Sequence, residues 1–387
     1  MKDLLLIPIS WLYGLVVGIR NRLFDMGVLK SKSYDIPVIS VGNITVGGTG
    51  KTPHVEYLIR LLHRQCKVAV LSRGYKRKSR GYRVADQQST AADIGDEPLQ
   101  MKRKYDDIVV AVCADRREGI EHLTADKGTR DTDVILLDDA YQHRWVKPGI
   151  NILLVDYHRQ LHADHMLPYG RMRERKEESK RADIIIITKC PSAIKPMDFR
   201  LLRDSIGVYP YQTLLFTTMQ YRALRPMYCG EDVELSSLDR DTHVLLIAGV
   251  AHPERMADDL QPHFSHPITL KSYADHHFFT ANDIADINAT FAALPDPRIA
   301  ITTEKDSARL FGQKGFEEDL RHHFFMAPIE VKFLQDEEEV FNEKILSYVE
   351  KNSKNSILVQ HKNQPTQDQP KEEKKNNTIS FRSNMTP

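Results

Sequence analysis

The sequence has few cysteines and lacks the closely spaced pairs that bind a structural metal. Cys66, Cys113, Cys190 and Cys229 are scattered over 387 residues, and none of them forms a C-x-x-C pair. This spacing argues against both a zinc site and a disulfide framework. A reducing, cytosolic compartment fits such a composition best.

The chain also lacks an excess of charge of either sign. Its 54 basic residues nearly cancel its 53 acidic residues, which leaves a formal net charge of +1. A whole-protein field that would gather nucleic acid is therefore not expected, and no nucleic acid or obligate protein partner is inferred. Because 41% of the residues are hydrophobic, the chain can build sizeable cores in two domains of ordinary size.

The apolar N-terminal run is too short for a simple membrane-spanning helix. Leu4–Ile19 has sixteen residues, where a spanning helix needs roughly twenty, and Pro8 weakens it further. A signal peptide is not expected either, because no positive charge precedes the run and no small-residue cleavage site follows it convincingly. We expect residues 1–34 to form a membrane-associating segment whose basic end faces anionic lipid headgroups. A buried core helix is the alternative.

Short apolar runs alternate with helical stretches between residues 35 and 190. Near-continuous apolar strands are typical of a parallel sheet covered by helices on both faces. The pattern predicts a doubly wound α/β domain of the P-loop NTPase type. The expected strands are Val38–Val41, Val68–Ser72, Ile108–Val112, Val134–Leu137, Ile152–Asp156 and Ile184–Thr188.

A glycine-rich loop lies between the first of these strands and a helical stretch, Pro53–Leu62. In such a loop the backbone N–H groups converge on the β- and γ-phosphates of a nucleoside triphosphate, Lys51 reaches the same oxygens, and the hydroxyl of Thr52 binds Mg²⁺. Thr45 stands where the usual pattern has its first glycine, which leaves this mechanism intact. A glycine-rich turn without a ligand is the less favoured alternative. The residues expected to bind the nucleotide are Val46, Gly47, Gly48, Thr49, Gly50, Lys51 and Thr52.

Two adjacent carboxylates end another predicted strand. Asp138 and Asp139 follow Val134–Leu137 directly. Ligands bind at the carboxyl ends of strands in open α/β sheets, and a carboxylate there holds Mg²⁺ directly or through water. We expect Asp138, Asp139 and Thr52 to form the magnesium site.

Two further patterns carry less weight. Thr188-Lys189 resembles a guanine-recognition loop, but Cys190-Pro191 follow where an aspartate would be needed, so ATP is favoured over GTP. His158, His162 and His165 could be drawn as a metal site with nearby aspartates. A solvated loop facing headgroups is the favoured interpretation of that segment.

The predicted elements divide the chain into segments. A second alternation of strands and helices begins near Val244, and the residues beyond Lys351 are too polar to bury a core. We expect a nucleotide-binding core over residues 35–210, a strand-pair connector over 211–240, a smaller α/β domain over 241–350, and a disordered tail without catalytic function over 351–387.

Six short motifs, taken in order, resemble one family, the tetraacyldisaccharide 4′-kinases of lipid A biosynthesis. The resemblance extends from the apolar N-terminus to about residue 345, and the ordered combination is specific. The motifs are Ser72-Arg73-Gly74-Tyr75, Gly95-Asp96-Glu97-Pro98, Asp138-Asp139-Ala140-Tyr141-Gln142-His143, Met172-Arg173-Glu174, Asp275-His276-His277 and Thr303-Glu304-Lys305-Asp306.

The resemblance implies a lipid kinase that acts peripherally or monotopically at the cytoplasmic face of the bacterial inner membrane. Its reaction would be transfer of the γ-phosphate of ATP to the 4′-hydroxyl of a tetraacyldisaccharide 1-phosphate, with Mg²⁺ as cofactor. The acylated disaccharide 1-phosphate and the lipids of the inner membrane are then the expected partners.

The resemblance also implies a general base. A sugar hydroxyl is a poor nucleophile until its proton is taken up, and the family match gives this role to Asp96 with His276 as its partner. Mg²⁺ and Lys51 would offset charge on the transferred group. On position alone, Asp96 could equally be a turn or N-cap residue, and His276 a structural histidine.

Further residues match the family's active-site cleft, where arginines would bind the 1-phosphate or the γ-phosphate. The separate roles of the two arginines stay open, and a solvated loop is the alternative for the Gln-His pair. These expected substrate-binding residues are Tyr75, Glu97, Arg116, Gln142, His143, Arg173 and Glu174.

Two other classes of function compete with the lipid kinase. A regulatory NTPase switch or metallochaperone needs neither a base for an acceptor hydroxyl nor a lipid anchor. A soluble small-molecule kinase or ligase would not account for the apolar N-terminus. The proposed Asp96–His276 pair and the run Leu4–Ile19 therefore favour the lipid kinase.

Overall fold

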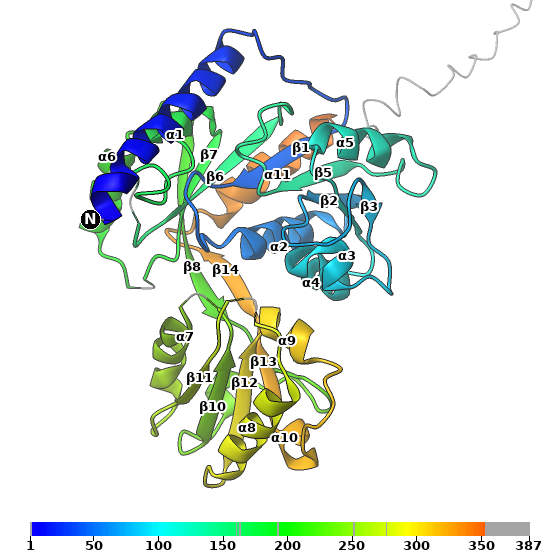
Figure 1. Cartoon of the computed structure of the whole chain (residues 1–387), viewed down its shortest axis with the longest axis vertical. Coiled ribbons are helices and arrows are strands. Elements are labelled where there is room, and N and C mark those ends of the chain that lie inside the picture. The colour runs from blue at the N-terminus through cyan, green and yellow to red at the C-terminus, as the bar shows by residue number, and fades with distance from the viewer. Residues whose placement is uncertain are drawn as a thin grey trace, which may run out of the picture.

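The computed structural model describes residues 2–352, except residues 160, 162, 163, 192, 251 and 276. Residues 353–387, which make up nearly all of the expected tail, lie outside the described part. The chain folds into a larger domain around a nine-stranded sheet and a smaller domain around a five-stranded sheet (Figure 1).

The larger sheet confirms the predicted fold class, because it is parallel except at its two edges. The edge strands β14 and β3 pair antiparallel with β8 and β4. Across the sheet the strands are β14 (Ile329–Phe333), β8 (Thr213–Tyr221), β7 (Ile184–Thr188), β6 (Ile150–Asp156), β1 (Val38–Gly42), β5 (Val134–Asp138), β2 (Val68–Ser72), β4 (Val109–Val112) and β3 (Arg83–Val84).

Helices cover both faces of this sheet, which explains why its central strands are apolar throughout. All six expected apolar runs form strands, and β1, β2, β5, β6 and β7 are buried at every position. The helices of the larger domain are α1 (Lys2–Asp25), α2 (Lys51–Leu62), α3 (Ala91–Ile94), α4 (Asp96–Lys104), α5 (Arg116–Ala125), α6 (Pro196–Ile206) and α11 (Glu338–Asn352), with a 3₁₀ helix, η2, at Lys176–Arg181.

The smaller domain is also α/β. Its strand order is β11 (Thr269–Ser272), β10 (His243–Ala248), β12 (Arg298–Thr303), β13 (Phe324–Ala327) and β9 (Arg225–Pro226), of which β9 alone runs antiparallel to its neighbour. The helices that pack on it are α7 (Pro253–Leu260), α8 (Ala281–Ala292), α9 (Glu304–Leu310) and α10 (Glu318–His322), and short 3₁₀ turns lie at Leu235–Ser237 and Gln261–His263.

The chain returns to the larger domain after the smaller one, so the domain boundaries differ from those expected. The segment 211–240 is divided: β8 belongs to the larger sheet and β9 to the smaller one. Residues 329–352, expected in the smaller domain, form edge strand β14 and helix α11 of the larger domain. They do so because Phe341 and Ile345 complete the apolar core beneath α2.

Helix α1 lies along the outside of the larger domain (Figure 1). Its apolar side chains are largely exposed, and the side chain of Trp11 reaches 80% exposure, so the alternative of a buried core helix is wrong for this part of α1. Only its C-terminal end is anchored by a core aromatic, Phe24, which is 7% exposed. Among the described helices, none combines the length and apolar character that crossing a membrane requires.

Candidate active site

The glycine-rich loop has the backbone conformation of a phosphate cradle. Gly47 and Gly50 have φ of +111° and +82°, a backbone region that residues other than glycine rarely adopt. Helix α2 begins at Lys51, two residues before the expected start, so Pro53 lies in its first turn. The N-terminal N–H groups of α2 therefore face the loop, where they favour a bound anion.

The strand register brings the two expected ligand groups together. Strand β1, which leads into the loop, pairs directly with β5, and Val41 lies opposite Asp138. As a result, the amine of Lys51 lies 3.7 Å from Oδ1 of Asp139. The phosphate loop and the carboxylate pair thus share one edge of the sheet.

Asp138 is buried in a way that suits a cation. Its side chain is nearly inaccessible and accepts a hydrogen bond of 3.1 Å from Ser72. Burial, together with the charges of Glu97 and Asp139, raises the pKa of Asp138 to about 7. A bound Mg²⁺ would remove this penalty, and the oxygen donors of Asp138, Asp139 and Thr52 are the kind that Mg²⁺ prefers.

Asp139 is held in the opposite electrostatic state. Its burial would raise its pKa, but the charges of Lys51 and Arg173 outweigh that effect and hold the pKa of Asp139 below its ordinary value. Nη1 of Arg173 lies 3.2 Å from both carboxylate oxygens and 3.4 Å from Oε1 of Gln142. The backbone of Asp139 has φ of +47°, which turns the chain sharply after β5.

Two expected substrate-binding residues are committed to the protein interior instead. Arg116 is 2% exposed and donates to the carbonyl oxygens of Cys113 and Asp138 at 3.0 and 3.1 Å. His143 accepts a hydrogen bond from the backbone N–H of Arg116, and burial lowers its pKa to about 4, so it is neutral at neutral pH. Arg116 thus ties the end of β4 to the end of β5.

Glu174 is likewise enclosed by the protein. It is fully buried, and it accepts hydrogen bonds from Asn21, Arg181 and Gln142. The sequence could not reveal this, because Asn21 and Gln142 come from distant segments of the chain.

The expected base is held by the smaller domain. Asp96 is the first residue of α4, and its Oδ2 pairs with Nη2 of Arg309 at 2.5 Å. The expected partner, His276, lies outside the described residues. Its neighbour Asp275 is paired with Lys305 at 2.8 Å, so α9 supplies one cation to Asp96 and another to Asp275.

Two weaker candidates line the same region. Tyr75 is 65% exposed, and the loop that carries it touches the loop before Asp96, since a Cβ on Gly95 would lie 3.0 Å from the carbonyl oxygen of Tyr75. Glu97 is close enough to Asp138 to raise its pKa. The structure therefore brings the segments that carry Tyr75 and Glu97 together, and it places Glu97 beside the carboxylate pair.

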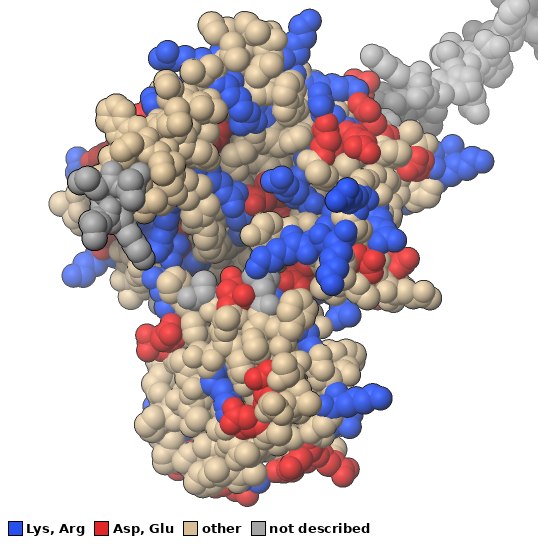
Figure 2. Space-filling view, viewed as in Figure 1, with Lys and Arg blue, Asp and Glu red and all other residues tan. Residues whose placement is uncertain are grey.

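The role of α9 was not visible in the sequence. Lys104 of α4 lies between Glu56 of α2 and Glu304 of α9, at 2.6 Å from each. Arg309 also reaches Asp306, whose backbone N–H donates to the side chain of Thr303, the N-cap residue of α9. Figure 2 shows Lys and Arg side chains gathered where the larger domain faces the smaller one, with Asp and Glu among them. Ion pairs thus join the two domains beside Asp96.

The alternative metal site around the histidine cluster finds no support in the described residues. Among them, no group of three His, Cys, Asp or Glu side chains is arranged to hold a metal ion, and His162 lies outside this part of the chain. Asp156, which was considered a ligand, pairs with Lys189 at 3.0 Å.

A cavity of about 420 Å³ lies between α1 and the loop that precedes Arg173. It is lined by apolar and aromatic side chains with one cation. The lining residues are Ile7, Ser10, Trp11, Gly14, His165, Met166, Tyr169 and Arg175.

Comparisons with known proteins agree on one family. The model of the tetraacyldisaccharide-1-P 4′-kinases matches residues 2–350. Tetraacyldisaccharide 4′-kinase from Phocaeicola vulgatus is 54% identical over 353 residues, which cover 91% of this chain and 96% of the relative. The enzyme of that name from Bacteroides fragilis is 46% identical over 362 residues, with 92% and 96% covered. The crystal structure of LpxK from Aquifex aeolicus in complex with ATP is 28% identical, covers 90% of this chain and 99% of that one, and superposes with a TM-score of 0.69.

Proposed function

The chain belongs to the tetraacyldisaccharide-1-P 4′-kinase family, and from this premise we propose how its own residues carry out the family's reaction. It is an ATP-dependent kinase of lipid A biosynthesis, which transfers the γ-phosphate of ATP to the 4′-hydroxyl of a tetraacyldisaccharide 1-phosphate. This reaction sets aside both an NTPase switch and a soluble small-molecule kinase.

The observation that carries the assignment of roles is the position of Asp96. It lies at the start of α4, ion-paired to Arg309, in the same region as the phosphate loop and the carboxylate pair. Arg309 fixes the orientation of the carboxylate, so Asp96 is positioned to take the proton of the 4′-hydroxyl.

A different set of residues acts on the phosphates of ATP. Lys51 offsets charge on the transferred group, and Arg173 holds Asp139 in its ionised form. Thr52, Asp138 and Asp139 hold Mg²⁺, which when bound neutralises charge on the phosphates. The positive charge of a bound Mg²⁺ would lower the pKa of Asp138, which burial raises in the metal-free protein.

We also place the enzyme at the cytoplasmic face of the inner membrane, attached peripherally through α1. One side of α1 presents exposed apolar residues in helical spacing, namely Trp11, Leu12, Leu15, Val16 and Ile19. The cavity beside this face is lined by apolar side chains and by Arg175, which suits a substrate that carries both acyl chains and phosphate.

Transfer of label from γ-labelled ATP to tetraacyldisaccharide 1-phosphate tests the function directly. The purified protein should label the lipid, and Lys51→Ala should reduce the rate by orders of magnitude while leaving the fold intact, because Lys51 acts on phosphate charge. A folded Lys51→Ala protein with near-normal turnover would remove the loop from the mechanism.

A further inference from the structure

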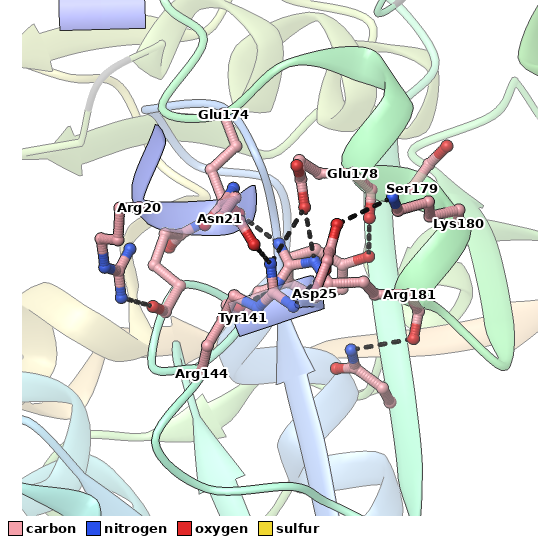
Figure 3. A network of polar contacts seen from close by, with 12 residues as sticks. Arg20, Asn21, Asp25, Tyr141, Arg144, Glu174, Glu178, Ser179, Lys180 and Arg181 are labelled. Carbon is pink, nitrogen blue, oxygen red and sulfur yellow. Dashed lines mark hydrogen bonds and ion pairs between the residues drawn. The ribbon is translucent and has the colours of Figure 1, made fainter. Parts of the chain in front are cut away.

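Helix α1 has a polar side that faces the catalytic loops, opposite its exposed apolar side. Asn21 lies on this side, is 1% exposed, and donates from Nδ2 to Oε1 of Glu174 at 2.9 Å. Figure 3 shows Asn21, Arg20 and Asp25 of α1 directed toward Tyr141, Arg144 and the segment 174–181. A helix that served only as a membrane anchor would not need buried polar contacts of this kind.

Glu174 is the centre of this network. Besides Asn21, it accepts hydrogen bonds from Nη2 of Arg181 at 2.5 Å and from Nε2 of Gln142 at 3.3 Å. A fully buried carboxylate is stable only when it is paired and hydrogen-bonded, so these partners fix its position. Three separate segments therefore meet at one side chain.

Glu174 is linked to Asp139 through Arg173, its neighbour in the chain, and Gln142, its hydrogen-bond partner. Arg173 precedes Glu174 in the chain and contacts both oxygens of Asp139 at 3.2 Å. Gln142 accepts from Arg173 through Oε1 at 3.4 Å. A shift of Glu174 would thus disturb Arg173, which contacts Asp139, and Gln142, which contacts Arg173.

Helix α1 also donates hydrogen bonds to the backbone of the segments that carry Arg173 and Gln142. The hydroxyl of Tyr13 donates to the carbonyl oxygen of Arg173 at 3.1 Å, and Nη2 of Arg20 donates to that of Gln142 at 2.7 Å. At the end of the helix, Asp25 pairs with Arg144 at 2.6 Å. The contacts with α1 therefore run along three of its turns.

The same segments join the phosphate loop. The N–H of Val46 donates to the carbonyl oxygen of Arg171 at 2.7 Å, and the N–H of Arg173 donates to that of Ile44 at the same distance. Gln142 donates to the carbonyl oxygen of Asn43 at 2.7 Å. The segments that carry Gln142 and Arg173 thus contact both helix α1 and the chain that leads from β1 into the phosphate loop.

We infer that Asn21 and Glu174 are positioning residues of the kinase, and that the polar side of α1 is a structural part of the catalytic centre. They hold Arg173 and Gln142 in place, and Arg173 in turn orients Asp139. This inference rests on the proposed function of the site. It gives α1 a second role, independent of its apolar face.

The test compares Glu174→Gln, which keeps the shape of the side chain and removes its charge, with Glu177→Gln. Glu177 lies three residues further along the chain and is exposed, whereas Glu174 is fully buried. Glu174→Gln should lower kcat for lipid in detergent micelles by about 10- to 100-fold, the usual loss when a residue behind a metal ligand is changed. Glu177→Gln should match the wild type.

Three further readouts separate positioning from mere stability. Glu174→Gln should raise the Mg²⁺ concentration needed for half-maximal binding of a fluorescent ATP analogue, leave the KM for ATP at saturating Mg²⁺ nearly unchanged, and leave sedimentation with phosphatidylethanolamine–phosphatidylglycerol vesicles unchanged. A purely structural residue would lower the thermal midpoint without altering the Mg²⁺ response of the folded fraction.

Asn21→Ala keeps the test decisive should Glu174→Gln fail to fold, since it removes one donor and leaves Arg181 paired with Glu174. A folded Asn21→Ala protein with normal kcat and a normal Mg²⁺ response would overturn the inference, and so would a folded Glu174→Gln protein with these properties. If the wild type labels no lipid, the proposed function fails, while the Mg²⁺ dependence of nucleotide binding still decides the role of Glu174.

Discussion

At the scale of single residues, Asp96 gives the sharpest test of the chemistry. Asp96→Asn keeps the size of the side chain and removes its capacity to take a proton, so kcat for lipid phosphorylation should fall by roughly 10²–10⁴, the usual contribution of a general base. The affinity for ATP should hardly change, because the phosphate loop and Mg²⁺ carry it. His276→Ala should cause a comparable or smaller loss.

The double variant of Asp96 and His276 tests whether the two act as a unit. If they do, it should lose less activity than the product of the two single losses, as measured by steady-state kinetics. Strictly multiplicative losses would reject the coupling, and a normal rate for Asp96→Asn would remove Asp96 from the mechanism.

Asp138 gives a prediction about pH. Burial raises its pKa to about 7, above the ordinary value of 3.8, so between these limits the folded protein binds more protons than the unfolded chain. The contribution of Asp138 to the free energy of unfolding therefore falls as pH rises from about 4 to about 7. In EDTA, the thermal midpoint of the wild type relative to Asp138→Asn should decline over this range.

The matched control for that experiment is Asp131→Asn, a change at an exposed carboxylate. It should keep the pH dependence of the wild type. Saturating Mg²⁺ should give the wild type and Asp138→Asn the same dependence of thermal midpoint on pH, because the metal favours the ionised form of Asp138. An unaltered slope in Asp138→Asn would show that another group titrates.

At the scale of elements, α1 is predicted to bind lipid through its apolar side. Leu12→Ser combined with Val16→Ser removes apolar groups from side chains that are 62% and 58% exposed. Since each buried methylene contributes about 0.8 kcal/mol, binding to anionic vesicles should weaken by at least about tenfold. Vesicle sedimentation measures this.

An equivalent change elsewhere controls for general loss of apolar surface. Val340→Ser alters a side chain on α11 that is 51% exposed, and it should leave vesicle binding unchanged. Equal binding by the α1 variant and the wild type would exclude this face as the membrane contact.

At the scale of the whole molecule, α11 is predicted to be essential to the nucleotide domain although it follows the smaller domain in sequence. Phe341, Ile345 and Val349 are at most 5% exposed, and burial of each contributes about 1.5–3 kcal/mol. A chain ended after Asp336 should therefore be unfolded or bind no ATP. A chain ended after Asn352 should keep the thermal midpoint and kcat of the full chain, as measured by circular dichroism and labelled-lipid formation.

The parts of this architecture that sequence could predict are those encoded locally. The strand Ile184–Thr188 is evident from its own apolar residues, and the phosphate loop from the glycines that precede Lys51. Burial and distant pairing are not encoded in this way. Glu174 and Glu177 are the same residue type three positions apart, yet one is fully buried and the other exposed.

Long-range partners show the same limit. Arg309 meets Asp96 across 213 positions of the chain, and nothing in the residues around either one indicates the other. The family resemblance marked Glu174 and Arg116 as important, but it could not distinguish contact with a substrate from support of the residues that make contact. That distinction depends on which side chains the fold leaves accessible.

The return of the chain to the larger sheet has a consequence for biosynthesis. The phosphate loop leaves the ribosome early, but β14 and α11, which close the edge and the core of its domain, emerge only after the entire smaller domain. Until then β8 presents an unpaired edge, and such edges invite association with other chains. The catalytic domain of this enzyme is therefore completed late in synthesis, and a chaperone that shields β8 would act in that interval.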